Sequence, residues 1–423
     1  MNILLKRVVD RVVRVGNLKM TDPNGVTHSF GDGTGQPVHV HIKTPQAERA
    51  IALHPSLAIA ETFMDQELDF LEGDVLLFLQ TVYQNMDPIG INDTLTRAIE
   101  SMRVAVRRIH QVNTQARARR NVQSHYDLSG ELYKLFLDAD MQYSCAYFER
   151  PDMTLEEAQL AKKRHIAAKM GLREGQSVLD IGSGWGGLGI YIARNFGADV
   201  LGVTLSTEQH AVSTERVRRE GLEGLVHFEL RDYRDLNERF DRIVSVGMFE
   251  HVGVNHYRTF FEKCSRLLKP DGVMLLHSIG RFGPPSSTNA FIRKYIFPGG
   301  YIPALSEVLP VIEKAGLMVG DVEILRLHYA ETLKAWRERF LANREKAKSI
   351  YDERFCRMWE FYLSGSEAAF RWQDMMVFQI QLTRRNDIVP ITRGYMEKTE
   401  RALALKDASE SEAMPGRLNA EAK

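Results

Sequence analysis

The sequence predicts an α/β protein in which a parallel, doubly wound sheet follows a smaller N-terminal α+β domain. Between about residues 175 and 280, five strand-like apolar runs alternate with helix-length segments, a pattern typical of a parallel sheet with helices on both faces. Residues 1–87 instead mix short runs such as PVHVHI with apolar helical stretches such as DVLLFLQTVY. The length of 423 residues is enough for two to three domains.

The composition is that of an ordinary globular protein with no net charge. Hydrophobic residues make up 44% and charged residues 26% of the sequence, and 55 basic side chains balance 55 acidic ones. No overall field would therefore draw the protein onto nucleic acid. Three scattered cysteines argue against a disulfide framework and favour a reducing, cytoplasmic location. No apolar run reaches the ~18 to 20 residues that cross a bilayer.

Two N-terminal segments carry basic side chains in patterns that suit a membrane surface. The start, MNILLKRVVDRVVRVG, places apolar residues at helical spacing on one face and Lys6, Arg7, Arg11 and Arg14 on the other. Such a helix either lies on lipid or packs its apolar stripe on its own domain, and both interpretations stay open. Residues 101–125 hold six arginines and no acidic residue, which fits a solvated linker or a basic surface that binds anionic lipid headgroups or nucleic acid.

A glycine-rich turn after the first strand of the sheet indicates a cofactor site. VLDIGSGWGG (178–187) is an apolar strand that ends in Asp180 and continues into glycines, which let the backbone approach a ligand closely. The glycine spacing alone also fits a dinucleotide. However, the acid precedes the turn, and the second strand ends at Thr204 rather than at a carboxylate for a ribose. The acid-before-glycine form resembles the first motif of class I S-adenosylmethionine-dependent methyltransferases, whose sheet is Rossmann-like.

Several longer motifs follow one another along the chain: HYDLSGELYKLFLD (125–138), QYSCAYF (142–148), DYRDL (232–236), DRIVSVGMFEHVG (241–253), LLHSIG (275–280), KYIFPGG (294–300) and HYAETLKAW (328–336). Together, and in this order, they resemble the cyclopropane-fatty-acid synthase family, whose members act on phospholipids or on mycolic acids. The resemblance implies transfer of a methylene group from S-adenosylmethionine to the cis double bond of an unsaturated acyl chain. The extra N-terminal domain looks like that of the phospholipid-acting branch.

The resemblance also implies the catalytic residues. Ring closure requires a base that removes a proton from the newly added methyl group, and in this family the base is a bicarbonate ion. Glu250 and His277 follow strands of the sheet, where open α/β folds place their sites. An ionised Glu250 would accept a hydrogen bond from the bicarbonate hydroxyl, and Cys145 is expected in the anion pocket, although its chemistry alone also permits a covalent nucleophile. Matching motif by motif, bicarbonate is held by Cys145, Glu250, His277, Ile279 and Tyr329.

The cofactor residues come from the glycine-rich motif and from the resemblance. Gln209 takes the sugar-hydroxyl role usually given to an acid, and Asp232 and Tyr233 border the adenine. Ser183 departs from many family members, which carry cysteine there. No metal is expected, because the histidines and cysteines lack spacings such as H-E-x-x-H or C-x-x-C. The complete cofactor set is Tyr143, Ser144, Asp180, Gly182, Gly184, Thr204, Leu205, Gln209, Asp232 and Tyr233.

Two further segments complete the expected organisation. Residues 281–305 interrupt the strand and helix rhythm with four prolines, which predicts an irregular insertion over the site. Its FIRKYIFPGG run either lines an acyl channel or is ordinary core and turn. We expect an N-terminal lipid-binding domain with a basic linker (1–124), a methyltransferase domain (125–400) and a disordered polar tail (401–423).

The sequence thus predicts a cytoplasmic enzyme that associates peripherally with the inner face of the membrane. It would use S-adenosylmethionine and bicarbonate on unsaturated phospholipids, without nucleic acid, and the resemblance is compatible with a homodimer. A different placement of the base would instead give a methyl-branched, methylene or oxygenated lipid. A non-catalytic lipid- or nucleic-acid-binding protein on this fold and, more distantly, a dehydrogenase are the remaining alternatives.

Overall fold

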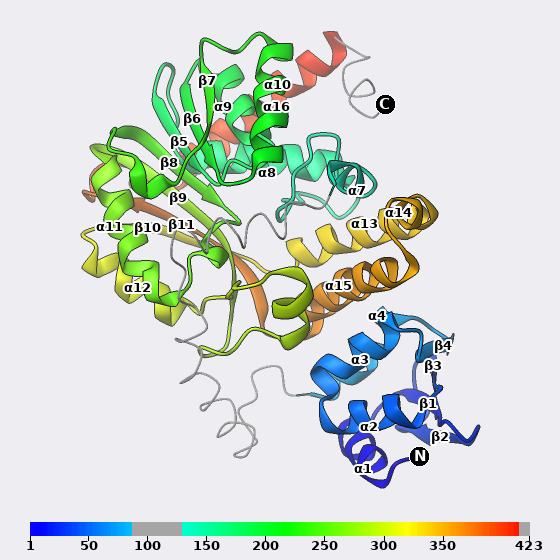
Figure 1. Cartoon of the computed structure of the whole chain (residues 1–423). Coiled ribbons are helices and arrows are strands. Elements are labelled where there is room, and N and C mark those ends of the chain that lie inside the picture. The colour runs from blue at the N-terminus through cyan, green and yellow to red at the C-terminus, as the bar shows by residue number, and fades with distance from the viewer. Residues whose placement is uncertain (87–128, 414–423) are drawn as a thin grey trace. The chain divides into compact units, whose positions relative to one another are not determined.

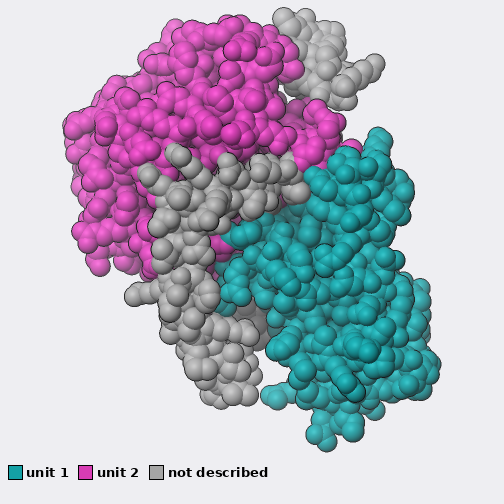
Figure 2. Space-filling view, in the orientation of Figure 1, with its two compact units in different colours: residues 1–106, 286–298, 333–375 teal, residues 107–285, 299–332, 376–423 magenta. Residues whose placement is uncertain are grey.

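The computed structural model describes residues 1–86 and 129–413 and divides into two compact units (Figures 1 and 2). Each unit collects stretches of chain that lie far apart in the sequence. The boundary expected at residue 124 and the arginine-rich segment 101–125 lie outside the described residues. Residues 1–106, 286–298 and 333–375 form unit 1, and residues 107–285, 299–332 and 376–423 form unit 2.

Unit 1 begins with the small α+β fold that the sequence predicted. Val38, Val40 and Ile42 alternate with more exposed residues along their strand and are all buried, as expected for a strand with one face on a core. The sheet has the order β2-β1-β3-β4, in which β1 and β3 are parallel and the other pairs antiparallel. Its elements are β1 (Asn17–Thr21), β2 (Thr27–Phe30), β3 (Pro37–Ile42), β4 (Leu68–Glu72), α1 (Ile3–Val12), α2 (Pro45–Leu53), α3 (Pro55–Met64) and α4 (Val75–Tyr83).

Two later parts of the chain complete unit 1. The long helix α15 packs against α3 and α4, and its Arg357 forms an ion pair with Asp69. Residues 286–298, from the expected irregular insertion, contain a short π-helix in which Tyr295 donates a hydrogen bond to Glu61 at 2.7 Å. A boundary drawn once along the sequence therefore could not separate the two units. The elements are η4 (Ile292–Ile296), α13 (His328–Ala342), which runs from unit 2 into unit 1, α14 (Arg344–Ile350) and α15 (Glu353–Trp372).

Unit 2 contains the predicted parallel sheet, with the strand order β10-β11-β9-β8-β5-β6-β7. The five predicted runs all form strands, and the pairs β5-β6, β6-β7, β5-β8 and β8-β9 are parallel. Two strands that the sequence did not predict, β10 and β11, extend the sheet and pair antiparallel with each other. The strands are β5 (Ser177–Ile181), β6 (Asp199–Thr204), β7 (Val226–Leu230), β8 (Phe240–Val246), β9 (Leu268–Arg281), β10 (Met318–Leu325) and β11 (Met375–Thr383).

Helices cover both faces of this sheet (Figure 1). Consecutive side chains of β5 therefore enter different cores: Val178 packs in a cluster with Ile190 of α9, and Leu179 in a cluster with Phe260 of α11. Burial on both faces explains why these strands are continuous apolar runs. The helical elements are α7 (Gly130–Lys134), α8 (Leu155–Lys169), α9 (Gly187–Phe196), α10 (Thr207–Glu220), α11 (Tyr257–Leu267), α12 (Leu305–Lys314), η1 (Tyr233–Asp235), η2 (Phe249–His251) and η3 (Val254–His256).

The chain after residue 400 corrects one expectation. The polar sequence predicted disorder from residue 401, but helix α16 (Gly394–Ala413) continues through this region and packs against α8. Leu403 is buried in the same cluster as Val178, and Asp407 Oδ2 accepts hydrogen bonds from Arg164 and Tyr191, both at 3.2 Å. Residues 401–413 are therefore helical rather than disordered, because these contacts anchor a segment whose average composition is polar, and residues 414–423 lie outside the described residues.

Candidate active site

The glycine-rich turn lies at the carboxyl end of β5, where the order of the sheet reverses. Strands β6 and β7 lie on one side of β5 and strands β8 and β9 on the other, which is the position where open α/β sheets bind ligands. Gly182 has φ +83°, and a Cβ there would lie 2.8 Å from the Cβ of Met248, so only glycine fits. The backbone N–H groups of Gly182 and Ser183 both donate to Val203 O, at 2.9 and 3.1 Å. The turn is thereby fixed against the end of β6.

Thr204 and Gln209, two of the expected cofactor residues, meet directly at the end of β6. Thr204 Oγ1 donates to Gln209 Oε1 at 3.0 Å, and both side chains are buried. Ser206 caps α10 by accepting a hydrogen bond from the backbone N–H of Gln209 at 3.2 Å. With its oxygen engaged, the side chain of Gln209 has its NH₂ group left to donate, and the expected contact with a sugar hydroxyl stays a prediction. Leu205 lies half-buried between them.

Asp180 and Asp232, the acids expected near the cofactor, have different surroundings. Asp180 is buried near the end of β5, and burial raises its pKa to about 7. Asp232 is also buried but is bound by Arg234, whose Nε and Nη2 donate to its two oxygens at 2.9 and 2.6 Å. Tyr233 packs edge-on against Phe260 with ring centroids 5.5 Å apart. The expected contacts of Asp232 and Tyr233 with the adenine stay a prediction.

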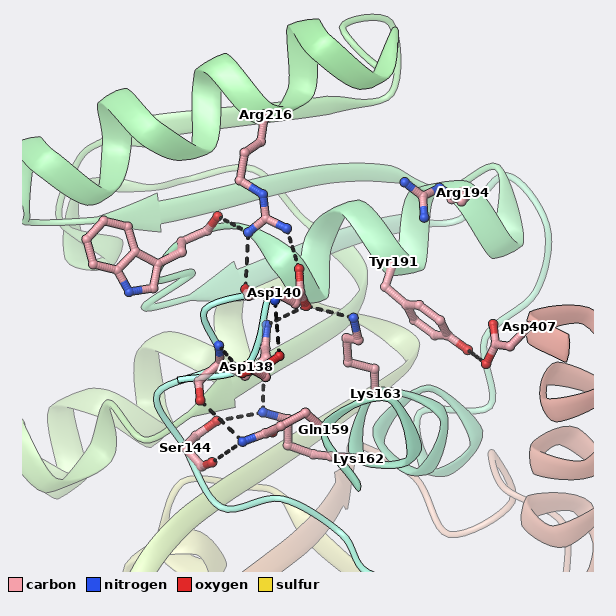
Figure 3. A network of polar contacts seen from close by, with 12 residues as sticks. Asp138, Asp140, Ser144, Gln159, Lys162, Lys163, Tyr191, Arg194, Arg216 and Asp407 are labelled. Atoms are coloured by element: carbon pink, nitrogen blue, oxygen red, sulfur yellow. Dashed lines mark hydrogen bonds and ion pairs between the residues drawn. The ribbon is translucent and has the colours of Figure 1, made fainter. Parts of the chain in front are cut away.

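The segment that carries Tyr143, Ser144 and Cys145 is held by helix α8 (Figure 3). Lys162 Nζ donates to Ser144 Oγ at 2.8 Å, and Gln159 Nε2 donates to Ser144 O at 3.0 Å. The sequence gave no warning of this role, because AQLAKKRHIAAK lacks the apolar stripe that marks a buried helix, yet nearly all of its residues are buried. Tyr143 packs on an aromatic neighbour, Tyr133, with centroids 5.2 Å apart.

Cys145 is a buried thiol rather than a nucleophile. Burial raises its pKa far above the ordinary range, so the protonated form dominates at neutral pH and the thiol acts as a donor. The next residue is anchored to the start of α13, because Ala146 N donates to Thr332 Oγ1 at 3.0 Å. Phe148 N donates to His328 Nδ1, also at 3.0 Å. These two bonds bring the segment containing Cys145 to the first turn of α13.

Tyr329, the expected tyrosine of the anion pocket, belongs to that first turn of α13 and is buried. The adjacent His328 stacks on Tyr147 with ring centroids 4.9 Å apart. Tyr147 in turn stacks on His165 of α8 at 4.1 Å. The motifs QYSCAYF and HYAETLKAW, which are far apart in the sequence, are therefore in contact.

Glu250 and Ile279, two more residues of the expected anion pocket, are hydrogen-bonded to each other. Glu250 follows β8 in η2, and its Oε1 accepts the backbone N–H of Ile279 at 2.6 Å. Its Oε2 is buried and accepts no hydrogen bond from the described residues. Burial raises the pKa of Glu250 to about 7. Tyr301, from the expected irregular insertion, donates its backbone N–H to Glu250 O at 2.9 Å, so part of that insertion borders this residue.

His277 lies beside these residues on β9, paired in register with Val246 of β8. Burial lowers its pKa to about 3, so the ring is neutral at physiological pH. Gln379 of β11 lies within the core, and its Nε2 is 3.1 Å from His277 Nδ1. Because an amide NH₂ can only donate, Nδ1 accepts and the ring proton is on Nε2. Sequence reasoning missed Gln379, since β11 itself was not predicted.

These groups fit a small anion that carries one proton. The Nε2–H of His277 is a donor, and the Cys145 thiol, a second donor, is directed to Ala146 O at 3.3 Å. Glu250 Oε2 is a buried acceptor without a partner among the described residues. Bicarbonate has oxygens for the donors and a hydroxyl for that acceptor. Among the described residues, no three His, Cys, Asp or Glu side chains are grouped as metal ligands.

Comparisons with known proteins identify the family of this chain. The family model described as mycolic acid cyclopropane synthetase matches residues 113–380. The chain belongs to this family. A second model, described as a domain of unknown function, matches residues 4–93.

Relatives and solved structures extend the family assignment. The chain is 41% identical over 350 residues to the cyclopropane-fatty-acyl-phospholipid synthase of Escherichia coli, covering 82% of this chain and 88% of that protein. It is 34% identical over 399 residues to a tuberculostearic acid methyltransferase of Mycobacterium tuberculosis, covering 90% of each. A mycolic acid cyclopropane synthase complexed with SAH and CTAB superimposes with a TM-score of 0.60 at 38% identity, covering 62% of this chain and 97% of that one.

The family confirms three expectations from the sequence. The chain is an S-adenosylmethionine-dependent methyltransferase, its larger unit has the expected Rossmann-like sheet, and S-adenosylmethionine is its cofactor. The individual contacts of the site residues with ligands stay predictions.

Proposed function

We propose that the protein transfers a methylene group from S-adenosylmethionine to the cis double bond of an unsaturated phospholipid acyl chain, with bicarbonate as the base, and forms a cyclopropane ring. The observation that carries the proposal is the buried Glu250 Oε2, which accepts no hydrogen bond from the described residues. His277 and Cys145, two other residues of the expected anion pocket, are buried as well. An alkene has no proton to lose before it attacks, so a base is needed only after methyl transfer, to remove a proton from the newly added methyl group.

The reaction has two steps that place different demands on the chain. The π electrons of the alkene form a bond to the methyl carbon as the S–CH₃ bond breaks, which leaves S-adenosylhomocysteine and a carbocation. A C–H bond of the new methyl group then breaks, its electrons close the ring, and the proton leaves to a base. Bicarbonate supplies that base when bound. Water must be excluded during both steps, because it would capture the cation as an alcohol.

The residues of the pocket have distinct parts in this scheme. Glu250 Oε2 accepts the hydrogen of the anion's hydroxyl, which turns the remaining oxygens toward the substrate. The backbone N–H of Ile279 fixes Glu250 through its other oxygen at 2.6 Å. His277 and Cys145 donate to the anion as neutral groups, and the Tyr329 hydroxyl completes the donors. A neutral imidazole adds no positive charge next to a developing cation.

An acyl chain within a phospholipid has to be met at a membrane surface, and α1 offers apolar side chains for this. Leu5 and Val13 are buried in the core of unit 1, whereas Ile3 is 72% and Leu4 48% exposed. The helix thus packs on its own domain and still presents apolar residues outward, next to exposed Lys6 and Arg7. None of the helices in the described part of the chain has the length and apolar character needed to span a bilayer. We propose peripheral binding to the inner face of the membrane. The homodimer expected from the resemblance stays a prediction.

Identifying the lipid product of the reaction tests the proposal. The purified protein is incubated with methyl-deuterated S-adenosylmethionine and vesicles of cis-monounsaturated phospholipid, with and without added bicarbonate, and the lipids are analysed by mass spectrometry. We expect a gain of one CD₂ unit with loss of the alkene, and a faster reaction with bicarbonate. Absence of labelled lipid would refute the phospholipid substrate.

A methyl-branched product is the second candidate, because the similar protein of Mycobacterium tuberculosis is a tuberculostearic acid methyltransferase. The same experiment separates the two: a lipid that retains an intact CD₃ group shows that the cation does not close to a ring.

A further inference from the structure

Lys162 is a fully buried ammonium group that forms no ion pair with the described residues. It lies in the middle of α8 with 1% of its surface exposed. Its Nζ donates to Gln142 Oε1 at 2.7 Å and to Ser144 Oγ at 2.8 Å, and both acceptors are neutral (Figure 3). No carboxylate of the described residues is within ion-pair distance of it. Buried charges are normally paired, because removing an unpaired ion from water costs several kcal/mol.

The acids close to Lys162 are engaged elsewhere. Asp140 forms ion pairs with Lys163, at 2.7 Å, and with Arg216. Asp138 accepts the backbone N–H groups of Asp140 and Gln142, at 3.2 and 2.9 Å, and burial raises its pKa to about 6. Lys163 therefore forms an ion pair within the protein. Lys162 forms none with the described residues, although its charge acts at longer range to lower the pKa of the buried Asp138 and Asp180.

The residues that are hydrogen-bonded to Lys162 lie next to the glycine-rich turn after β5. A Cβ on Gly187, the first residue of α9, would lie 2.5 Å from Gln142 Nε2. Arg216 Nη1 donates to Trp185 O, within the turn, at 2.9 Å and to Asp140 O at 3.3 Å. The segment that Lys162 holds is thus in contact with the glycine-rich turn after β5.

The hydrogen bond from Lys162 also determines that the Ser144 hydroxyl acts as a donor to any other group. Because Ser144 Oγ accepts a hydrogen from the ammonium, its own hydroxyl hydrogen is directed to another acceptor. The negatively charged group of S-adenosylmethionine is its carboxylate. The sugar hydroxyls of S-adenosylmethionine suit Thr204 and Gln209, which meet at the end of β6. A donor next to an unpaired buried cation suits the carboxylate.

We propose that Lys162 is the positioning residue for the carboxylate of S-adenosylmethionine: it holds Ser144 as a donor and supplies the positive charge that this carboxylate neutralises. The inference rests on the cofactor of the family and not on the lipid product proposed above. Burial lowers the pKa of Lys162 to about 8, and a bound carboxylate would raise it again. Fixing the amino-acid end of the cofactor in this way fixes the direction of the S–CH₃ bond.

The test compares Lys162→Met with Lys163→Met as the matched control. Dissociation constants are measured by calorimetry for S-adenosylmethionine and for decarboxylated S-adenosylmethionine. In Lys162→Met we expect the affinity for S-adenosylmethionine to fall by about 10- to 100-fold, the usual effect of losing a charged hydrogen-bonding partner, while the affinity for the decarboxylated analogue is unchanged or raised. Lys163→Met should keep the wild-type ratio of the two affinities, because Lys163 is paired with Asp140.

Other outcomes would overturn the proposal. An equal loss for both ligands would mean that Lys162 only holds the segment in shape. If Lys162→Met kept its affinity for S-adenosylmethionine but its activity no longer rose with bicarbonate, the positive charge of Lys162 would serve the bicarbonate base instead. If Lys162→Met does not fold, Ser144→Ala gives the same readout, since it removes the donor and should reduce the preference for the carboxylated ligand. The calorimetric affinities need no lipid, so their failure is separate from failure of the proposed reaction.

Discussion

Replacing Glu250 with Gln should stabilise the protein at alkaline pH while it abolishes most of the activity. The pKa of this carboxyl rises from its ordinary 4.5 to about 7 because the group is buried. At ~1.4 kcal/mol for each tenfold change in proton affinity, ionising it within the fold costs about 3 kcal/mol. Below pH 4.5 the carboxyl is neutral in the folded and unfolded chain. Wild-type stability falls as the pH rises from 4.5 to 7, where only the unfolded chain has released the proton, and it levels off above pH 7. Gln keeps the acceptor for the Ile279 N–H and is neutral throughout.

The assay is thermal unfolding of wild type and Glu250→Gln between pH 5.5 and 8.5, with binding of S-adenosylmethionine measured in parallel. We expect the melting temperature of the variant to exceed that of wild type by an amount that grows to several degrees at pH 8.5, with cofactor binding retained. Glu323→Gln is the control of opposite sign. Burial works to raise the pKa of Glu323, but hydrogen bonds from His165 and Lys169 outweigh it and hold the pKa at about 2, so this variant should be less stable over the whole range. A constant difference for Glu250→Gln, or full activity, would refute the reasoning.

Three further substitutions test other parts of the structure. Gln379→Leu removes the donor to His277 Nδ1 and should weaken activation by bicarbonate by about 5- to 100-fold, with little change in cofactor affinity. Nitrogen NMR of the His277 ring should show loss of the Nε2–H tautomer. An unchanged spectrum would contradict the tautomer assignment. Gly182→Ala should abolish cofactor binding in a folded protein, because its Cβ would lie 2.8 Å from Met248, and calorimetric binding of wild-type strength would disprove this. Leu403→Ala should destabilise the methyltransferase unit by ~2–4 kcal/mol in urea unfolding, whereas no change would mean that α16 is dispensable.

The expected catalytic residues show which features of the site could be predicted from the sequence. The motifs supplied Cys145, Glu250 and His277, but their protonation states came from burial, which raises the first two pKa values and lowers the third. Lys162 and Gln379 were missed because neither belongs to a recognisable motif. Their importance arises from contacts with residues that are 18 and 102 positions away along the chain.

The sequence by itself determined the alternating core of the fold, the family and the glycine turn, because these depend on local periodicity and on residue types at fixed spacing. Only the tertiary structure decided which stretches form each unit, that α16 is ordered, and which buried groups lack partners. Packing of α15 on α3 and of Leu403 in the core joins distant segments through surfaces that average composition does not reveal. Burial and hydrogen bonding are properties of a residue's surroundings in three dimensions, so the charges that control this site became visible only in the folded chain.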